Sequence, residues 1–263
     1  MLDTKTIGGE VDIALCRSAL YEALALGFRP PTNETVARLA SPEGASALSD
    51  AAAVLDAEWH TDLAALVRRV AASPRPSSLE PLEAPYRRLF GHTVHGRVPP
   101  YETEYGEDSP FLPAQEMSDL AAFYRAFGLA LRPAEHERID HISCECEFLL
   151  FLARKEAYAL QHGDQAMREE VRRASRLFLR DHLGRFGPAF GKKLARDDQG
   201  GFHGALGELC ASLVAHECER AGVAAGPEYL RLRSTADVEV PMACGTEREL
   251  LQIQGVASSA NKE

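Results

Sequence analysis

The sequence has few β-branched residues and no long apolar run. Isoleucine and valine total 18 of the 263 residues, whereas alanine and leucine total 72. Because Ala and Leu favour helices while Ile and Val favour strands, this composition predicts an all-α fold. No segment reaches the roughly 20 consecutive apolar residues that a membrane-spanning helix needs. We therefore expect no stable membrane insertion.

Basic residues are also in the minority. The chain has 29 Lys and Arg against 39 Asp and Glu, which gives a formal net charge of −10. Affinity for nucleic acid rests on Lys and Arg that displace counterions from phosphates, so we expect no nucleic-acid partner. An acidic surface favours a basic partner instead.

Cysteine is too sparse for a disulfide scaffold, with six residues over the whole chain. The N-terminal stretch MLDTKTIGGEVD lacks the basic and then apolar pattern of a secretory signal. These two features predict a cytoplasmic protein with free thiols.

Helical periodicity predicts one bundle of about ten helices over residues 1–225 and a partly ordered tail over residues 226–263. The pattern for residues 135–161 is apolar on nearly every side, which predicts a buried central helix. A short helix is expected after Gly187-Pro188, and a short amphipathic piece at residues 247–253 in the tail. The clearest of the other helical patterns cover residues 11–28, 45–56, 60–72, 79–90, 114–127, 165–181 and 202–221.

One irregular stretch, residues 91–113, interrupts the helices and reads GHTVHGRVPPYETEYGEDSPFLP. Loops of this length are uncommon in compact domains and often carry function. A run of acidic residues is usually a solvated loop, but the aromatic residues interleaved with this one also allow a binding surface. His92 and His95 also form a His-x-x-His pair, but no Cys or carboxylate with metal-ligand spacing accompanies it.

Three ionisable residues, Asp140, His141 and Glu145, fall at the start of the predicted central helix. Such groups are costly in a core unless they are paired or partly solvated. In one interpretation Asp140 stabilises the helix start and His141 hydrogen-bonds to Glu145. In a second, these residues and Cys144 bind a metal ion in a helical metal-dependent enzyme. In a third, they line a recognition groove. The sequence contains no nucleophile elbow, phosphate-binding loop or dinucleotide fingerprint.

Four segments resemble a known family. In chain order they are Tyr86-Arg87-Arg88-Leu89-Phe90, Pro99-Pro100-Tyr101, Asp140-His141-Ile142-Ser143-Cys144-Glu145 and residues 178–213. In these motifs and in their order the chain resembles the TorD/DmsD/NarJ family of redox-enzyme maturation proteins, which are chaperones for molybdenum-containing oxidoreductases. The resemblance covers about residues 10–220.

The resemblance implies binding without catalysis. It implies an all-helical cytoplasmic chaperone that binds the apo catalytic subunit of a molybdopterin-containing oxidoreductase, together with its twin-arginine leader where one is present. It also implies that the chaperone assists cofactor insertion and assembly before export. We expect no resident cofactor or metal ion; whether a nucleotide or the molybdenum cofactor also binds stays open. Relatives exchange helices between protomers, which leaves open a homodimer formed in that way.

A leader with a basic region and an apolar region requires an apolar groove with negative charge at one end. Carboxylates suit such a groove because they bind arginine in a bidentate manner. The residues expected to bind the client are Tyr86, Phe90, Pro99, Pro100, Tyr101, Glu102, Glu104, Tyr105, Asp140, His141 and Glu145.

Overall fold

The computed structural model describes residues 4–72, 79–91, 96–107, 112–131 and 137–233. Within these ranges the chain forms ten α-helices and two short helical segments, and only two isolated β-bridges, so the prediction of an all-α fold is confirmed. The elements are α1 (Thr4–Gly27), α2 (Asn33–Thr35), the π-helical η1 (Val36–Ala40), α3 (Pro42–Trp59), α4 (Leu63–Ala72), α5 (Glu80–Phe90), the 3-10 turn η2 (Glu102–Glu104), α6 (Leu112–Ala126), α7 (Ile142–His162), α8 (Gln165–Asp181), α9 (Leu183–Asp197) and α10 (Phe202–Ala221).

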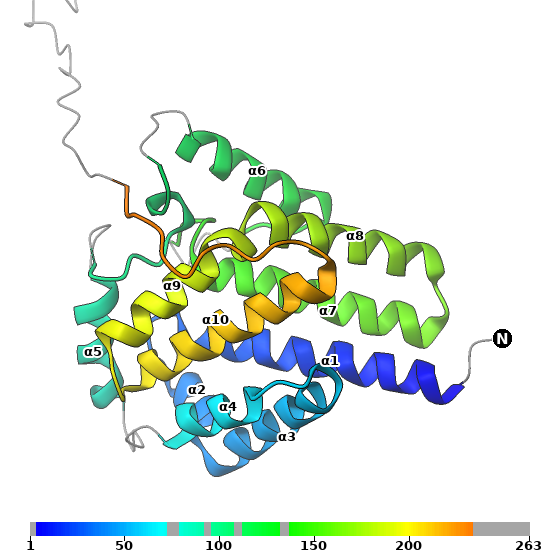
Figure 1. Cartoon of the computed structure of the whole chain (residues 1–263), viewed down its shortest axis with the longest axis horizontal. Coiled ribbons are helices and arrows are strands. Elements are labelled where there is room, and N and C mark those ends of the chain that lie inside the picture. The colour runs from blue at the N-terminus through cyan, green and yellow to red at the C-terminus, as the bar shows by residue number, and fades with distance from the viewer. Residues whose placement is uncertain (1–3, 73–78, 92–95, 108–111, 132–136, 234–263) are drawn as a thin grey trace, which may run out of the picture.

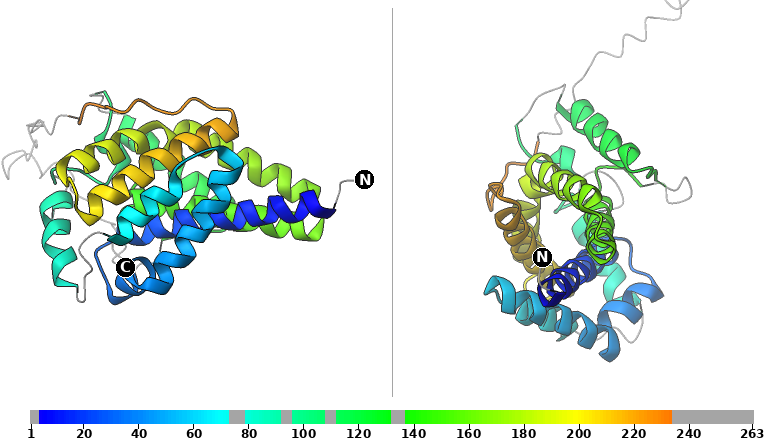
Figure 2. Two further views of the ribbon diagram at one scale, coloured as in Figure 1. Left: turned by 60° about the horizontal axis from the view of Figure 1, so that its bottom comes forward. Right: turned by 90° about the vertical axis from the view of Figure 1, so that its right-hand side faces the viewer.

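Helices α1 and α7 lie side by side through the middle of the bundle (Figure 1). Helix α8 packs on α7, and α9 and α10 form a second closely packed pair, while α3 and α4 cover α1 and α10 on the opposite side (Figure 2). Large apolar side chains from these helices, including Leu20, Phe28, Phe178, Phe186 and Phe190, are fully buried. Within the described residues, no helix is both long and apolar enough to cross a membrane.

The close approach of α9 to α10 requires glycine. A Cβ added at Gly191 would lie 2.4 Å from the carbonyl oxygen of Gly207, and a Cβ at Gly207 would lie 2.5 Å from that of Gly191. Both of these oxygens belong to the helix backbone, so they cannot shift to make room for a side chain as a flexible side-chain end could. The pair therefore fixes the distance between the two helices.

A buried ionic network joins three helices at the centre of the bundle. The Arg17 guanidinium donates from Nε and Nη2 to both carboxylate oxygens of Glu217, at 2.7 and 2.8 Å, and from Nη1 to Glu156, at 2.6 Å. Arg172 and Arg220 bind the same two carboxylates from the rim. Although burial opposes ionisation, Arg17 and Arg220 lower the pKa of Glu217 to about 2. The network thus ties α1, α7 and α10 together in the core, and α8 joins it at the rim through Arg172.

Helices α8 and α10 have the predicted bounds, but the start of the central helix was predicted wrongly. α7 begins at Ile142 rather than near Glu135, because His141 is its N-cap. Likewise α9 begins at Leu183 and contains Pro188 internally, so the short helix expected after Gly187-Pro188 is part of a longer one. The N-terminal helix also begins earlier than predicted, at Thr4.

The last described residues run back over the bundle from the end of α10. Val223, Leu230 and Leu232 pack against the main core, and the Gly226 N–H donates to the Gly184 carbonyl at 2.8 Å. Residues 226–233, which were assigned to the tail, therefore contact the helical body. The boundary at residue 225 stays a prediction, and the amphipathic piece at 247–253 lies outside the described residues.

Candidate functional site

The loop after α5 meets the start of α7 through main-chain hydrogen bonds. The Glu102 N–H donates to the Asp140 carbonyl at 2.9 Å, and the Ile142 N–H donates to the Pro100 carbonyl at 2.8 Å. Tyr101 and His141 consequently form an isolated antiparallel bridge. Two motifs that lie 40 residues apart in the sequence are thus in direct contact, at the end of the bundle where α5 lies (Figure 1).

Asp140 holds this junction together. Its side chain is fully buried and accepts hydrogen bonds from the hydroxyl of Thr103 at 2.7 Å and from the Thr103 N–H at 3.3 Å. The Arg138 guanidinium binds both of its carboxylate oxygens, at 2.7 and 3.0 Å. Asp140 therefore fixes η2, rather than stabilising the start of α7 through a side-chain cap.

His141 supplies the cap of α7. Its Nδ1 accepts from the Ser143 N–H at 3.1 Å and lies 2.7 Å from the Ser143 hydroxyl, so the predicted hydrogen bond to Glu145 was wrong. Burial, reinforced by the nearby Arg29 and Arg138 charges, lowers the pKa of His141 to about 3. The imidazole is therefore neutral at pH 7, and its ring lies edge-on to Tyr101 at 5.4 Å.

Glu102 is the second buried carboxylate of the junction. One oxygen accepts from Nδ1 of His182 at 3.0 Å and the other accepts from Arg185 at 2.6 Å. Arg185 also donates to Glu116 on α6, at 2.7 Å. This chain of contacts links η2 to α6 and α9.

Glu145 lies beneath the junction with neither carboxylate oxygen hydrogen-bonded to a described residue. The side chain is fully buried. Burial, together with the nearby charges of Glu102 and Asp140, raises the pKa of Glu145 well above its usual value. Its surroundings in the core thus favour the protonated form of Glu145 over the ionised one.

The remaining apolar candidates pack the loop against the bundle. The Tyr105 hydroxyl donates to the Pro99 carbonyl at 2.8 Å, and its ring contacts Phe186. Pro99 and Pro100 are buried in the same layer. On α5, Tyr86 contacts Phe90 with ring centroids 4.7 Å apart, and both rings approach His203. Phe90 is buried, whereas Tyr86 is half-buried.

The exposed edge of the junction is formed by Tyr86, Tyr101, Glu104, Glu137 and Arg138, all of which are partly exposed. The Tyr101 hydroxyl donates to Glu137 at 3.2 Å, and Arg138 stacks on the Tyr101 ring at 4.2 Å. Burial raises the pKa of Glu104 to about 7. We call these five residues the junction edge; they present two aromatic rings and two carboxylates beside one guanidinium.

No group of three or more His, Cys, Asp or Glu side chains is arranged to hold a metal ion in the described ranges. At the proposed metal cluster, the carboxylate of Asp140 is used by Arg138 and Thr103, and Nδ1 of His141 faces Ser143. His92 and His95 lie outside the described residues. The residues present therefore do not fit the metal-dependent alternative.

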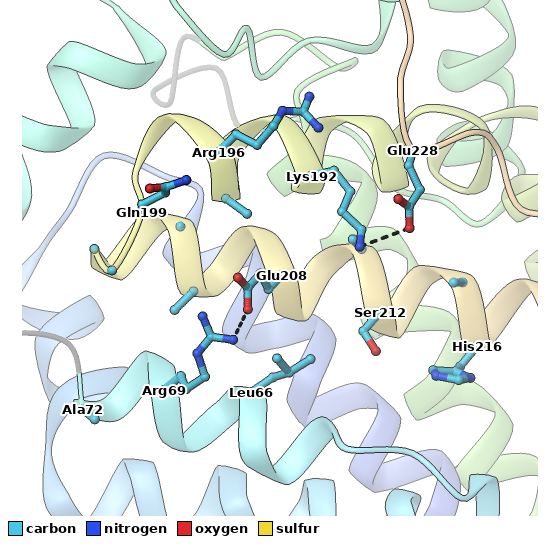
Figure 3. Close-up of a pocket in the computed structure, with 17 residues that line it drawn as sticks. Leu66, Arg69, Ala72, Lys192, Arg196, Gln199, Glu208, Ser212, His216 and Glu228 are labelled. Atoms are coloured by element: carbon cyan, nitrogen blue, oxygen red, sulfur yellow. Dashed lines mark hydrogen bonds and ion pairs between the residues drawn. The ribbon is translucent and has the colours of Figure 1, made fainter.

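A groove of about 940 Å³, which the sequence did not predict, lies between α4, α9 and α10 (Figure 3). Its floor consists of small residues of α10, and ion pairs of Lys192 with Glu228 and of Arg69 with Glu208 flank it. Its small and charged residues come from three separate helices, so no single motif marks it. None of the predicted client-binding residues lines it.

Comparison with known proteins supports the resemblance noted from the motifs. The family model described as nitrate reductase delta subunit matches residues 52–191. A selenate reductase assembly chaperone of Thauera selenatis is 34% identical over 133 residues, which cover 49% of this chain and 67% of that protein. The chaperone protein TorD of Photobacterium profundum is 30% identical over 131 residues, 49% of this chain and 59% of that protein.

A dimethyl sulfide dehydrogenase assembly chaperone of Rhodovulum sulfidophilum is 33% identical over 139 residues, which cover 48% of this chain and 54% of that protein. The matches thus span between about half and two thirds of these relatives' own lengths. All three relatives are named as chaperones, in agreement with the prediction that this chain is not an enzyme.

Proposed function

This chain belongs to the nitrate reductase delta subunit family, the TorD/DmsD/NarJ group predicted from its motifs, and we propose on this basis that it is an assembly chaperone for a molybdoenzyme. The client is the apo catalytic subunit of a molybdopterin-containing oxidoreductase. The chaperone binds that subunit in the cytoplasm and releases it after cofactor insertion.

The observation that carries this proposal is the contact between the Pro99-Pro100-Tyr101 loop and the Asp140-His141 corner. Both are motifs of the family resemblance. The buried members, such as Asp140 and Glu102, hold the junction in shape, while the junction edge offers the surface for contact. Two aromatic rings beside Glu104 and Glu137 suit an apolar segment that carries arginine, as a twin-arginine leader does.

The test is capture of the client by the full chain. The chain is co-expressed with the apo catalytic subunit of a molybdoenzyme from the same organism, in cells that lack the molybdenum cofactor. We expect the two to purify as a stable complex. Failure to form a complex with the apo-subunit would remove this proposal.

A pair of charge variants tests the junction edge. Glu104→Gln with Glu137→Gln is expected to weaken binding of the leader peptide at least tenfold, because two carboxylates that face the arginines are lost. The matched control is Glu169→Gln with Glu170→Gln, which removes two exposed acids from α8 and leaves the junction intact. Equal affinities of the two variants would show that the junction edge is not the binding surface.

A further inference from the structure

Residues 226–233 form a strap that runs along α9 and ends at the η2 loop (Figure 1). The strap begins with the hydrogen bond from Gly226 to Gly184, where a Cβ would lie 1.9 Å from the Arg185 carbonyl oxygen. Its sequence ends in Leu230-Arg231-Leu232-Arg233, an alternation of apolar and basic residues. The strap thus has the chemistry of a basic and apolar peptide.

The strap pairs with the loop in the manner of an added strand. The Gly106 N–H donates to the Arg231 carbonyl at 2.9 Å, and the Arg233 N–H donates to the Glu104 carbonyl at 2.8 Å. Between them Tyr105 and Leu232 form an antiparallel bridge. Main-chain pairing of this kind gives affinity without requiring a particular sequence, and pockets for side chains add specificity.

The side chain of Arg233 fills a pocket beside this main-chain pairing. Its guanidinium forms a fork with Glu116, from Nη1 at 2.8 Å and from Nη2 at 3.0 Å. It also donates from Nη1 to the Thr103 carbonyl at 2.6 Å and from Nε to the Glu107 carbonyl at 3.0 Å. Only 8% of the Arg233 side chain is exposed. We call these four acceptor positions, two carboxylate oxygens and two carbonyls, the arginine socket; its fork geometry suits arginine and not lysine.

The four acceptors of the socket are hydrogen-bonded, whereas several buried polar atoms of the neighbouring junction are not bonded to any described residue. Within the described residues, eight buried side-chain nitrogen and oxygen atoms have no hydrogen-bond partner, and five of them belong to Glu104, Glu145, His182 and Arg185. Arg185 shares Glu116 with Arg233, and His182 shares Glu102 with Arg185. Because Arg185 also binds Glu116, the carboxylate of the socket keeps a partner when Arg233 leaves it.

We propose that the arginine socket is a binding site for an extended Leu-Arg peptide of the client, and that the chain's own strap fills it until the client displaces it. The proposal rests on the proposed function, because the client's basic and apolar leader is the competing peptide. Glu104 belongs to both surfaces, since its side chain lies in the junction edge and its carbonyl pairs with the strap, so one extended leader spans the junction edge and the socket. Occupation of the site by Leu232-Arg233 identifies the chemistry of its ligand. The strap then acts as an internal competitor that only a peptide of higher affinity replaces.

The experiment uses the full chain and a fluorescein-labelled peptide, GPEYLRLRSTA, which copies residues 226–236. Full-length Arg233→Ala is expected to bind this peptide at least tenfold more tightly than the wild type, because a tethered competitor acts at an effective concentration of about millimolar. The double variant Arg233→Ala with Glu116→Gln should lose this increase in affinity for the labelled peptide, because the socket then lacks its carboxylate. The matched control Arg196→Ala removes an exposed arginine of α9 and should bind as the wild type does.

The second arm adds the unlabelled leader peptide of the molybdoenzyme that the chain captures. It should displace the labelled peptide from Arg233→Ala, whereas the same leader with its arginines changed to glutamine should not. Circular dichroism checks that each variant is folded. Arg233→Lys keeps the charge but loses the fork, so its affinity for the labelled peptide should lie between those of the wild type and Arg233→Ala. Equal binding of the labelled peptide by wild type and Arg233→Ala, or a leader that fails to compete, overturns this proposal. Capture of the apo-subunit tests the proposed function separately.

Discussion

Replacement of Glu217 by glutamine tests the buried network at the centre of the bundle. Glu217 is fully buried and binds Arg17 through two hydrogen bonds. Its pKa is lowered from 4.5 to about 2, and each pKa unit corresponds to about 1.4 kcal/mol, so the ionised form contributes about 3 kcal/mol to the free energy of unfolding. Loss of one partner from a buried ion pair costs about 3–5 kcal/mol, which agrees. We therefore expect Glu217→Gln to lower the free energy of unfolding at pH 7 by about 3 kcal/mol.

The assay is urea-induced unfolding followed by circular dichroism, at pH 7 and at several lower pH values. Because the folded-state pKa lies below the unfolded one, the stabilisation is complete above about pH 4.5 and is lost as the pH falls through about 2. The difference between wild type and Glu217→Gln should therefore shrink below about pH 4.5. Glu219→Gln, two residues along α10 with a side chain 83% exposed, is the matched control. A loss below about 1 kcal/mol, or a loss that does not change with pH, would refute the reasoning.

Three further substitutions probe other parts of the fold. Asp140→Ala removes the acceptor of four hydrogen bonds and should lower the free energy of unfolding by about 3 kcal/mol in urea titrations; no loss would contradict its anchoring role. Glu145→Gln should become more stable relative to the wild type as the pH rises. The folded-state pKa of Glu145 is raised, so the wild type loses free energy of unfolding as the pH rises through that pKa, whereas glutamine does not titrate. A variant less stable than the wild type at every pH would contradict this. Gly191→Ala should lower the thermal midpoint through a cost of about 2 kcal/mol, whereas Gly9→Ala, with open space around it, should not; equal midpoints would argue against the α9–α10 contact.

Much of the fold follows from local sequence. The bounds of α8 and α10 are as predicted because strong apolar periodicity ends at capping residues: Asp164 accepts from the Met167 N–H, and Gly222 adopts the left-handed conformation that ends α10. The start of α7 was missed because its cap is a histidine, which is not among the common capping residues. Local sequence patterns thus predict where the helices lie, and the unusual histidine cap explains why the predicted start of α7 was wrong.

The structure brings the predicted loop and the Asp140-His141 corner into contact, while the client-binding role of their residues stays a prediction. The loop and the Asp140-His141 corner come together as the family motifs imply, but the hydrogen bonds depend on partners far along the chain. Glu102 finds Arg185 and His182, and Arg17 finds Glu156 and Glu217, across 80 to 200 positions. Helical periodicity carries no information on such pairs, since it reports only which face of a helix is buried. For the same reason the strap and the arginine socket were not predicted.

The most direct test of the chaperone function compares the affinity of the full chain for the apo and the cofactor-loaded catalytic subunit. Isothermal titration calorimetry with both forms of the same client gives the two dissociation constants. A chaperone that releases a finished subunit should bind the apo form at least tenfold more tightly. Equal affinity for both forms would contradict this account and would indicate a permanent accessory subunit instead.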